Sequence, residues 1–112
     1  MSTKKEFICL VPDKPDALQK RLDVRGQHLE GVKPLVANGT VVCGGGTVDS
    51  HPVPGETPSF NGSALIVLAE SEAEVRELIA KDIYTRSGVW DVEKAQVIPF
   101  MCAVRVGDKA LP

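Results

Sequence analysis

Four stretches of the chain have the short apolar pattern that is typical of β-strands. Residues 6–11 are apolar and end at a run of prolines and aspartates that breaks regular structure. Residues 40–43 and 63–69 form two further apolar stretches, separated by a loop over residues 49–59 that holds three prolines. A longer stretch covers residues 92–106, where Pro99 indicates a bulge or an edge position. The pattern therefore predicts four strands.

Between the first two strands, apolar residues recur three, four or seven positions apart, which predicts an amphipathic helix. It should begin at Asp16, the expected N-cap, and extend to about Ala37, where Asn38-Gly39 ends it. Pro34 lacks a backbone donor and crowds the preceding turn, so a kink or break is expected near it. The positions expected to face the core are Leu18, Leu22, Leu29, Val32 and Val36.

A second helix is predicted after the third strand. Ser71 and Glu74 have the spacing of a capping box, and Val75, Leu78 and Ile79 supply the inward face of a helix that ends near residues 81–82.

The resulting β-α-β-β-α-β order predicts an α+β, ferredoxin-like fold, with a four-stranded antiparallel sheet and both helices on one face. One domain is expected over residues 1–112, with its core at about 6–106 and a loose C-terminal tail. The other face of so apolar a sheet would be exposed, so a homodimer formed through that face is expected.

The composition of the chain argues against two classes of function, nucleic-acid binding and membrane insertion. The 112 residues include 13 Lys+Arg and 15 Asp+Glu, a net charge of −2, and only five aromatic residues. Such a chain lacks the basic field and the stacking surface that favour nucleic-acid binding. No apolar run approaches the roughly 20 residues of a membrane span, and the first residues do not resemble a signal peptide. We therefore expect a cytoplasmic protein that binds neither nucleic acid nor membrane.

The three cysteines are Cys9, Cys43 and Cys102, and their spacing matches no zinc-binding pattern. They are expected to be reduced thiols in the core, and neither a metal nor a cofactor is expected. Gly44-Gly45-Gly46 lacks the residues of a phosphate-binding loop, so a bulge or a close approach of two backbones is the better interpretation.

The first predicted helix also carries groups that can perform chemistry. Arg25 falls among its apolar positions, and Arg21 and His28 lie together on the adjoining flank. Because unpaired buried charge is costly, these groups must either meet carboxylates or line a hydrated cleft. A structural ion pair is the simpler interpretation of such a helix.

A histidine beside a carboxylate is the commonest general-base pair, because the carboxylate fixes the tautomer of the imidazole. Asp49, after the glycines, and Asp82, at the end of the second helix, are both candidates to partner His28. Asp13, by contrast, is interpreted as a turn residue, and His51 as an exposed loop residue.

The segments KRLDVRGQHLEGV, NGTVVCGGG, FNGSALIVL and KDIYTRSGVWDVEKAQVIPF together resemble the YCII family of dimeric α/β-barrel proteins. The resemblance covers about residues 7–105. The family's pattern of two arginines and a histidine matches Arg21, Arg25 and His28, and its Gly-Ser matches Gly62-Ser63. Its Asp-Pro-Tyr matches residues 82–84, although Ile83 stands where proline is usual.

The resemblance implies a pocket between helices and sheet, with a His-Asp dyad built on His28 and with Arg21, Arg25, Ser63 and Tyr84 binding the substrate. It implies a cofactor-independent lyase or isomerase of dehydratase, dehydrohalogenase or cyclase type. Such an enzyme would act on a small cyclic or aromatic metabolite, in catabolism or in secondary metabolism. Two alternatives are a non-catalytic small-molecule-binding or accessory dimer, and a purely structural dimer with a buried ion network.

Overall fold

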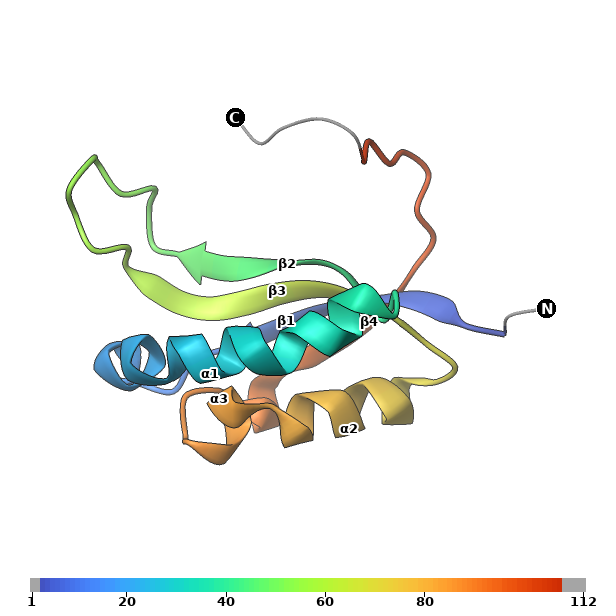
Figure 1. The fold of residues 1–112 in the computed structure, drawn as a ribbon, viewed down its shortest axis with the longest axis horizontal. Helices are drawn as coiled ribbons and strands as arrows, with labels where there is room; N and C mark the ends of the chain where they lie inside the picture. The colour runs from blue at the N-terminus through green and yellow to red at the C-terminus, as the bar shows by residue number, and fades with distance from the viewer. Residues whose placement is uncertain (1–2, 108–112) are drawn as a thin grey trace.

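The computed structural model describes residues 3–107, and its helices cover one face of a four-stranded antiparallel sheet (Figure 1). The predicted ferredoxin-like order is confirmed, with one short helix added after the second long one. The elements are β1 (Lys5–Pro12), α1 (Leu18–Ala37), β2 (Val41–Val48), β3 (Phe60–Ala69), α2 (Glu72–Lys81), α3 (Ile83–Arg86), a 3₁₀ turn (Val92–Lys94) and β4 (Gln96–Phe100). Most of the tail that was predicted to be loose lies outside the described residues.

The strands lie in the order β2-β3-β1-β4, so β1 and β3 are central. Alternate residues of a strand point to opposite faces, and Phe7, Cys9 and Val11 of β1 are buried on the face that the helices cover. Val67 pairs with Phe7 and is buried beside it. Trp90, which is 1% exposed, completes this core from the segment after α3.

The opposite face of the sheet is apolar, and no helix of residues 3–107 lies over it. It presents Ile8 and Leu10 from β1, Ile66 from β3, and Ile98 and Phe100 from β4, as the strand register dictates. Leu10 is 37% exposed and Ile98 41% exposed. The predicted uncovered face is therefore present in the protomer.

The start of α1 differs from the prediction. Asp16 has φ 60°, in the left-handed region, and the helix begins at Leu18 with Ala17 as N-cap and no side-chain cap. Asp16 as N-cap was therefore wrong, because this backbone conformation places it before the helix. The helix then continues through Pro34 without a break, and the Asn38 N–H donates to the Pro34 carbonyl at its end (3.0 Å).

The apolar stripe of α1 does not pack into the core as predicted. Leu29 is 42% and Val36 55% exposed, whereas Arg21 is the buried residue of this helix. Val24 and Leu35 make the partial contacts with the core instead. Leu29 and Val36 are exposed because they line a cavity between α1 and β2.

The three glycines lie inside β2, which is twice the predicted length. The pairing with β3 shifts register on either side of the glycines, between Val41 and Cys43 and between Thr47 and Val48, so the glycines themselves do not form the predicted bulge. A Cβ on Gly44 would lie 2.7 Å from Leu65, and one on Gly46 would lie 2.5 Å from the ring of Phe60. Glycine is therefore required at these two positions, because side chains of β3 lie too close to the β2 backbone to leave room for a Cβ atom. This tertiary packing overrides the poor β-propensity of glycine.

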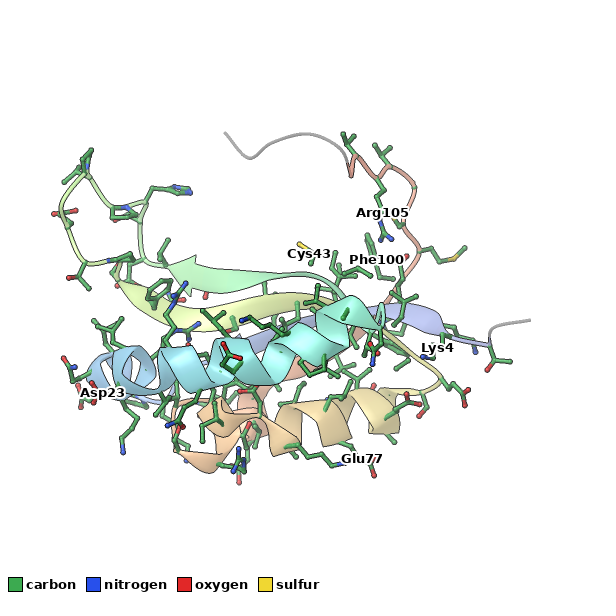
Figure 2. The ribbon with its side chains drawn as sticks, viewed as in Figure 1. Lys4, Asp23, Cys43, Glu77, Phe100 and Arg105 are labelled. Carbon is green, nitrogen blue, oxygen red and sulfur yellow. The ribbon has the colours of Figure 1, made fainter. Side chains whose placement is uncertain are left out.

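The last strand is much shorter than the predicted 92–106. It ends at Phe100, which pairs with Glu6 near the start of β1, so the following residues have no strand left to pair with. They leave the sheet, although Arg105, labelled with Phe100 in Figure 2, forms an ion pair with Glu6. β4 is an edge strand, as Pro99 indicated.

The two ends of α2 are both capped, and the C-terminal cap positions a residue of the candidate site. Ser71 caps this helix as predicted, accepting from the Glu74 N–H at 3.2 Å. Asp82 ends α2 and at once caps α3, because its Oδ1 accepts from the Tyr84 N–H at 2.9 Å. Two successive helix boundaries therefore fix the Asp82 carboxylate.

The cysteines do not share one environment. Cys9 is fully buried, and burial raises the pKa of its thiol to about 11. Cys43 is exposed on β2 and Cys102 is partly exposed after β4, so the expectation of three core thiols was wrong for these two. Cys43 lies in a strand that continues beyond its predicted end, and Cys102 follows a strand that ends earlier than predicted.

No helix within residues 3–107 has the length and apolar character that crossing a membrane requires.

Candidate functional site

A pocket of about 380 Å³ lies between α1 and the sheet. Leu29, Val32 and Val36 of α1 line one side, and the three glycines of β2, residues 44–46, line the other with bare backbone. The pocket exists because the glycines present no side chains to fill the space below the helix. The polar groups on its lining are Arg21, Arg25, His28, Ser63 and Tyr84, all of which the sequence had singled out.

His28 and Asp82 meet beside this pocket. The Nδ1 of His28 lies 2.8 Å from Asp82 Oδ1, and the two side chains are 13% and 15% exposed. A carboxylate only accepts hydrogen bonds, so the Nδ1–H donates, and in the neutral imidazole Nε2 then carries the lone pair. Because His28 lines the pocket and no described residue bonds Nε2, that lone pair is available to a ligand.

Aromatic rings fix the plane of the imidazole. His28 lies nearly parallel to the Tyr84 ring, with centroids 3.9 Å apart and 9° between the planes. Trp90 meets both rings edge-on, with centroids 5.8 Å from His28 and 5.5 Å from Tyr84. The imidazole is thus held by a carboxylate at one edge and by ring packing on its face, so its orientation is set before any ligand binds.

Arg21 is buried at the inner end of the pocket, with 4% of its surface exposed. Its Nη1 donates to both oxygens of Asp13, at 2.8 and 2.9 Å, and its Nη2 donates to Ser63 Oγ at 2.8 Å. The Trp90 indole N–H also donates to Ser63 Oγ, at 3.1 Å. Both contacts use this oxygen as an acceptor, so the Ser63 hydroxyl can still donate.

Burial acts on the ionisation of two groups near the pocket. It raises the pKa of the Asp13 carboxyl above its ordinary value, and the hydrogen bonds and charge of Arg21 oppose this effect only in part. Burial also raises the pKa of the Tyr84 phenol, against the charges of Arg21 and Arg25. Tyr84 is therefore a neutral phenol at physiological pH, and its hydroxyl has no hydrogen-bond partner within the described part of the chain.

Arg25 differs from Arg21 in its environment. It is exposed, it lines the pocket, and it forms no ion pair with any carboxylate of residues 3–107. The same helix thus supplies one arginine that is committed to Asp13 and one that is open to a ligand.

The structure separates the two candidate partners of His28. Asp49 lies where β2 enters the loop, accepts a hydrogen bond from Asn61 Nδ2 at 2.7 Å and does not line the pocket. Asp82 is the carboxylate in contact with His28. His51 is exposed in the same loop as Asp49.

Three residues of the site were missed by sequence reasoning. Asp13 looked like a turn residue beside two prolines, yet it carries the ion pair with Arg21. Trp90 and Phe60 hold the buried groups in place, the latter with its ring centroid 5.0 Å from the Arg21 guanidinium carbon. An arginine that borders the buried face of a helix requires a carboxylate partner, and this requirement could have pointed to Asp13.

The described residues contain no group of three or more His, Cys, Asp or Glu side chains positioned to hold a metal ion. The arrangement offers instead an oriented imidazole, a phenol, a hydroxyl and a free guanidinium around one small pocket. These groups can accept a proton from a ligand and stabilise the negative charge that develops.

Comparison with known proteins identifies the family to which this architecture corresponds. The family model of the YCII-related domain matches residues 6–101. Fusaric acid biosynthesis protein 2 of Gibberella fujikuroi is 42% identical over 96 residues, which are 86% of this chain and 92% of that protein. Aspartate kinase FUB3 of Fusarium oxysporum f. sp. lycopersici is also 42% identical, over 99 residues, but this chain spans only 18% of its length.

Among solved structures, the chain is similar to 5-chloro-2-hydroxyhydroquinone dehydrochlorinase (TftG) from Burkholderia phenoliruptrix, determined in complex with 2,5-dihydroxybenzoquinone. The TM-score is 0.72 and the sequences are 30% identical, over 86% of this chain and 93% of that one. That protein binds a small cyclic molecule.

Proposed function

The chain belongs to the YCII-related family, and on this basis we propose that it is a cofactor-independent lyase or isomerase that moves a proton on a small cyclic or aromatic metabolite. The observation that carries the proposal is the 2.8 Å contact between His28 Nδ1 and Asp82 Oδ1 at the edge of a ligand-sized pocket. In this mechanism His28 is the general base and Asp82 orients it.

The reaction begins when Nε2 of His28 takes a proton from a carbon or oxygen of the substrate. The electron pair of the broken bond moves into the ring system, and the negative charge develops on a substrate oxygen. Arg25, Tyr84 and Ser63 supply hydrogen-bond donors to that oxygen, and donors positioned in advance stabilise such charge most effectively. In a lyase reaction the intermediate then expels a leaving group with the bonding electron pair, and the imidazolium passes its proton to that group or to water. In an isomerase reaction the imidazolium returns the proton to another atom of the substrate.

Asp82 has two effects on His28 in this scheme. It holds the Nδ1–H tautomer, which leaves Nε2 as the proton acceptor, and it stabilises the imidazolium that forms. Its own position is fixed by the Tyr84 N–H at the start of α3. We assign no part in the proton transfer to Asp49, because it is bonded to Asn61 instead.

The similar proteins support this class of chemistry. One is named for the biosynthesis of fusaric acid, and TftG is a dehydrochlorinase whose structure holds a cyclic ligand. We therefore propose that this protein tailors a metabolite, either in a biosynthetic or in a catabolic sequence.

The uncovered sheet face supports a second part of the proposal, a homodimer formed through that face. Leu10, Ile66 and Ile98 belong to one apolar surface, and a second copy of the same surface would bury it. Two sheets packed face to face in this way form the dimeric α/β barrel expected for the family.

The test of the proposed activity is a panel of phenols, chlorinated quinols and lactones, followed by proton NMR in deuterated water and by chloride release. Turnover by the protein and its loss in His28→Gln support the proposal, because glutamine can still donate to Asp82 but is not a base. Turnover that is unaffected by His28→Gln would contradict the proposed mechanism, and binding of panel compounds without any turnover would favour a binding module.

A further inference from the structure

The basic groups on the pocket lining differ in whether a carboxylate already pairs with them. Arg21 donates to both oxygens of Asp13, and His28 donates to Asp82. Arg25 has no such partner among residues 3–107, and no aspartate or glutamate lies on the pocket lining. One positive charge on the pocket lining therefore has no carboxylate partner among the residues that the structure describes.

The position of Arg25 relates this charge to the proton acceptor. Arg25 and His28 are three residues apart on α1, so they are neighbours on one helix face, about 5–6 Å apart at their Cβ atoms. Burial is the main influence on the Tyr84 phenol and raises its pKa, but the charges of Arg21 and Arg25 act on it in the opposite direction. The Arg25 guanidinium is thus close enough to the phenol to influence it.

The remaining surfaces restrict the size of the ligand. The volume of about 380 Å³ is near the lower end of the range for small-molecule pockets, about 300–1,000 Å³. Leu29 and Val32 form an apolar wall, and the bare backbone of residues 44–46 forms the wall opposite. A pocket of this volume has room for a single ring.

We propose that the pocket selects a monocyclic ligand that carries one anionic oxygen group, and that Arg25 binds this group while the ring presents its acidic hydrogen to His28. The inference rests on the proposed function for the role of His28, and it adds the charge and size of the substrate. Arg25 is then the residue that determines specificity for anions, whereas Arg21 maintains the structure of the pocket.

The test is titration calorimetry with two probes of nearly equal shape, benzoate as the anion and benzamide as its neutral counterpart. We expect benzoate to bind about 10- to 100-fold more tightly, as a charge-assisted hydrogen bond implies. Arg25→Gln should abolish this preference by weakening benzoate binding alone, and added salt should reduce it in the wild type. Lys20→Gln removes an exposed charge from the same helix outside the pocket and should preserve the preference.

Equal affinity for the two probes, a preference that survives Arg25→Gln, or no saturable benzoate binding at millimolar concentration would each overturn the inference. Circular dichroism of Arg25→Gln confirms that the variant is folded, as expected for an exposed residue without an ion pair. The preference should persist in His28→Gln, because binding requires no base. An Arg25-dependent preference in a protein whose turnover does not need His28 would therefore refute the proposed function and leave this inference standing.

Discussion

The imidazole of His28 lies nearly parallel to the phenol ring of Tyr84, with 3.9 Å between the ring centroids and 9° between the planes. Tyr84 also follows Asp82 by two residues and donates its backbone N–H to the carboxylate that holds His28. One short segment therefore controls both the plane of the imidazole and the atom that its Nδ1–H meets. The orientation of the proposed base depends on the α2–α3 boundary as much as on its own helix.

Two substitutions of Tyr84 separate ring packing from the hydroxyl. Tyr84 is 2% exposed, so Tyr84→Ala should lower the free energy of unfolding by about 3–5 kcal/mol, as for other buried aromatic residues. Tyr84→Phe should cost less than about 1 kcal/mol, because within the described chain the hydroxyl has no hydrogen bond to lose. Urea denaturation measures both values. A cost for Tyr84→Phe that equals that of Tyr84→Ala would show that the ring stack contributes little.

The ionisation of Tyr84 can be followed directly, because it is the single tyrosine of the chain. Burial raises the pKa of its phenol, so the phenolate absorbance should rise with a midpoint above the ordinary value of 10.0. The folded state then favours the protonated phenol. Its contribution to stability is present below pH 10 and is lost as the pH rises through the midpoint of the folded protein. The same titration in denaturant is the control, and a folded midpoint at or below 10 would contradict the buried placement.

Arg21→Met should destabilise the fold at neutral pH, because it leaves the Asp13 carboxylate buried without its cation. Breaking a buried pair from one side costs about 3–5 kcal/mol. Burial already raises the pKa of Asp13, and loss of Arg21 should raise it further. Neutral Asp13 is tolerated in the folded state, so part of the lost stability should return as the pH falls and should disappear again as it rises through the raised pKa.

Arg76→Gln is the matched control for this variant, since Arg76 belongs to an exposed pair with Glu72. It should change the unfolding free energy by less than about 1 kcal/mol. Thermal denaturation at acidic and neutral pH measures both variants. An Arg21→Met protein as stable as Arg76→Gln at neutral pH would show that the buried pair is dispensable.

Sedimentation tests the proposed dimer. The chain mass is 12.0 kDa, so the protein should sediment at about 24 kDa at micromolar concentration. Leu10→Glu or Ile98→Glu places a charge on the uncovered sheet face and should yield monomers. Val53→Glu, in the exposed loop between β2 and β3, introduces the same charge elsewhere and should leave the dimer intact. A wild-type protein that stays monomeric would refute pairing through this face.

The sequence was informative where local pattern and tertiary structure agree. The apolar strand β1 and the Ser71 cap of α2 both depend on neighbouring residues, and both were predicted. The length of β2 was not, because Gly44 and Gly46 are required by Leu65 and Phe60, which lie on β3 beyond the intervening loop. The excess length given to β4 has a similar origin, since its end depends on where β1 begins.

The same limit applies to the candidate site. The helical spacing predicted Arg21 and His28 together on one flank, with Arg25 among the adjoining apolar positions, and all three line the pocket. Spacing could not decide between Asp49 and Asp82, because the choice depends on how α2 docks beside α1. Nor could it show that Arg21 and Arg25 have different environments, since that difference arises from the ion pair of Arg21 with Asp13, which lies outside the helix.

Turnover of the most active compound of the substrate panel, compared between the wild type, His28→Gln and Asp82→Asn, decides whether His28 transfers the proton. The Asp82→Asn variant should retain the capping of α3, since asparagine is a good N-cap, but its amide would not hold the imidazole as a carboxylate does. We predict that both variants fold and that each loses about 10²- to 10⁴-fold in turnover, with the His28 variant at least as impaired. Full turnover in folded His28→Gln would refute general-base catalysis by this residue.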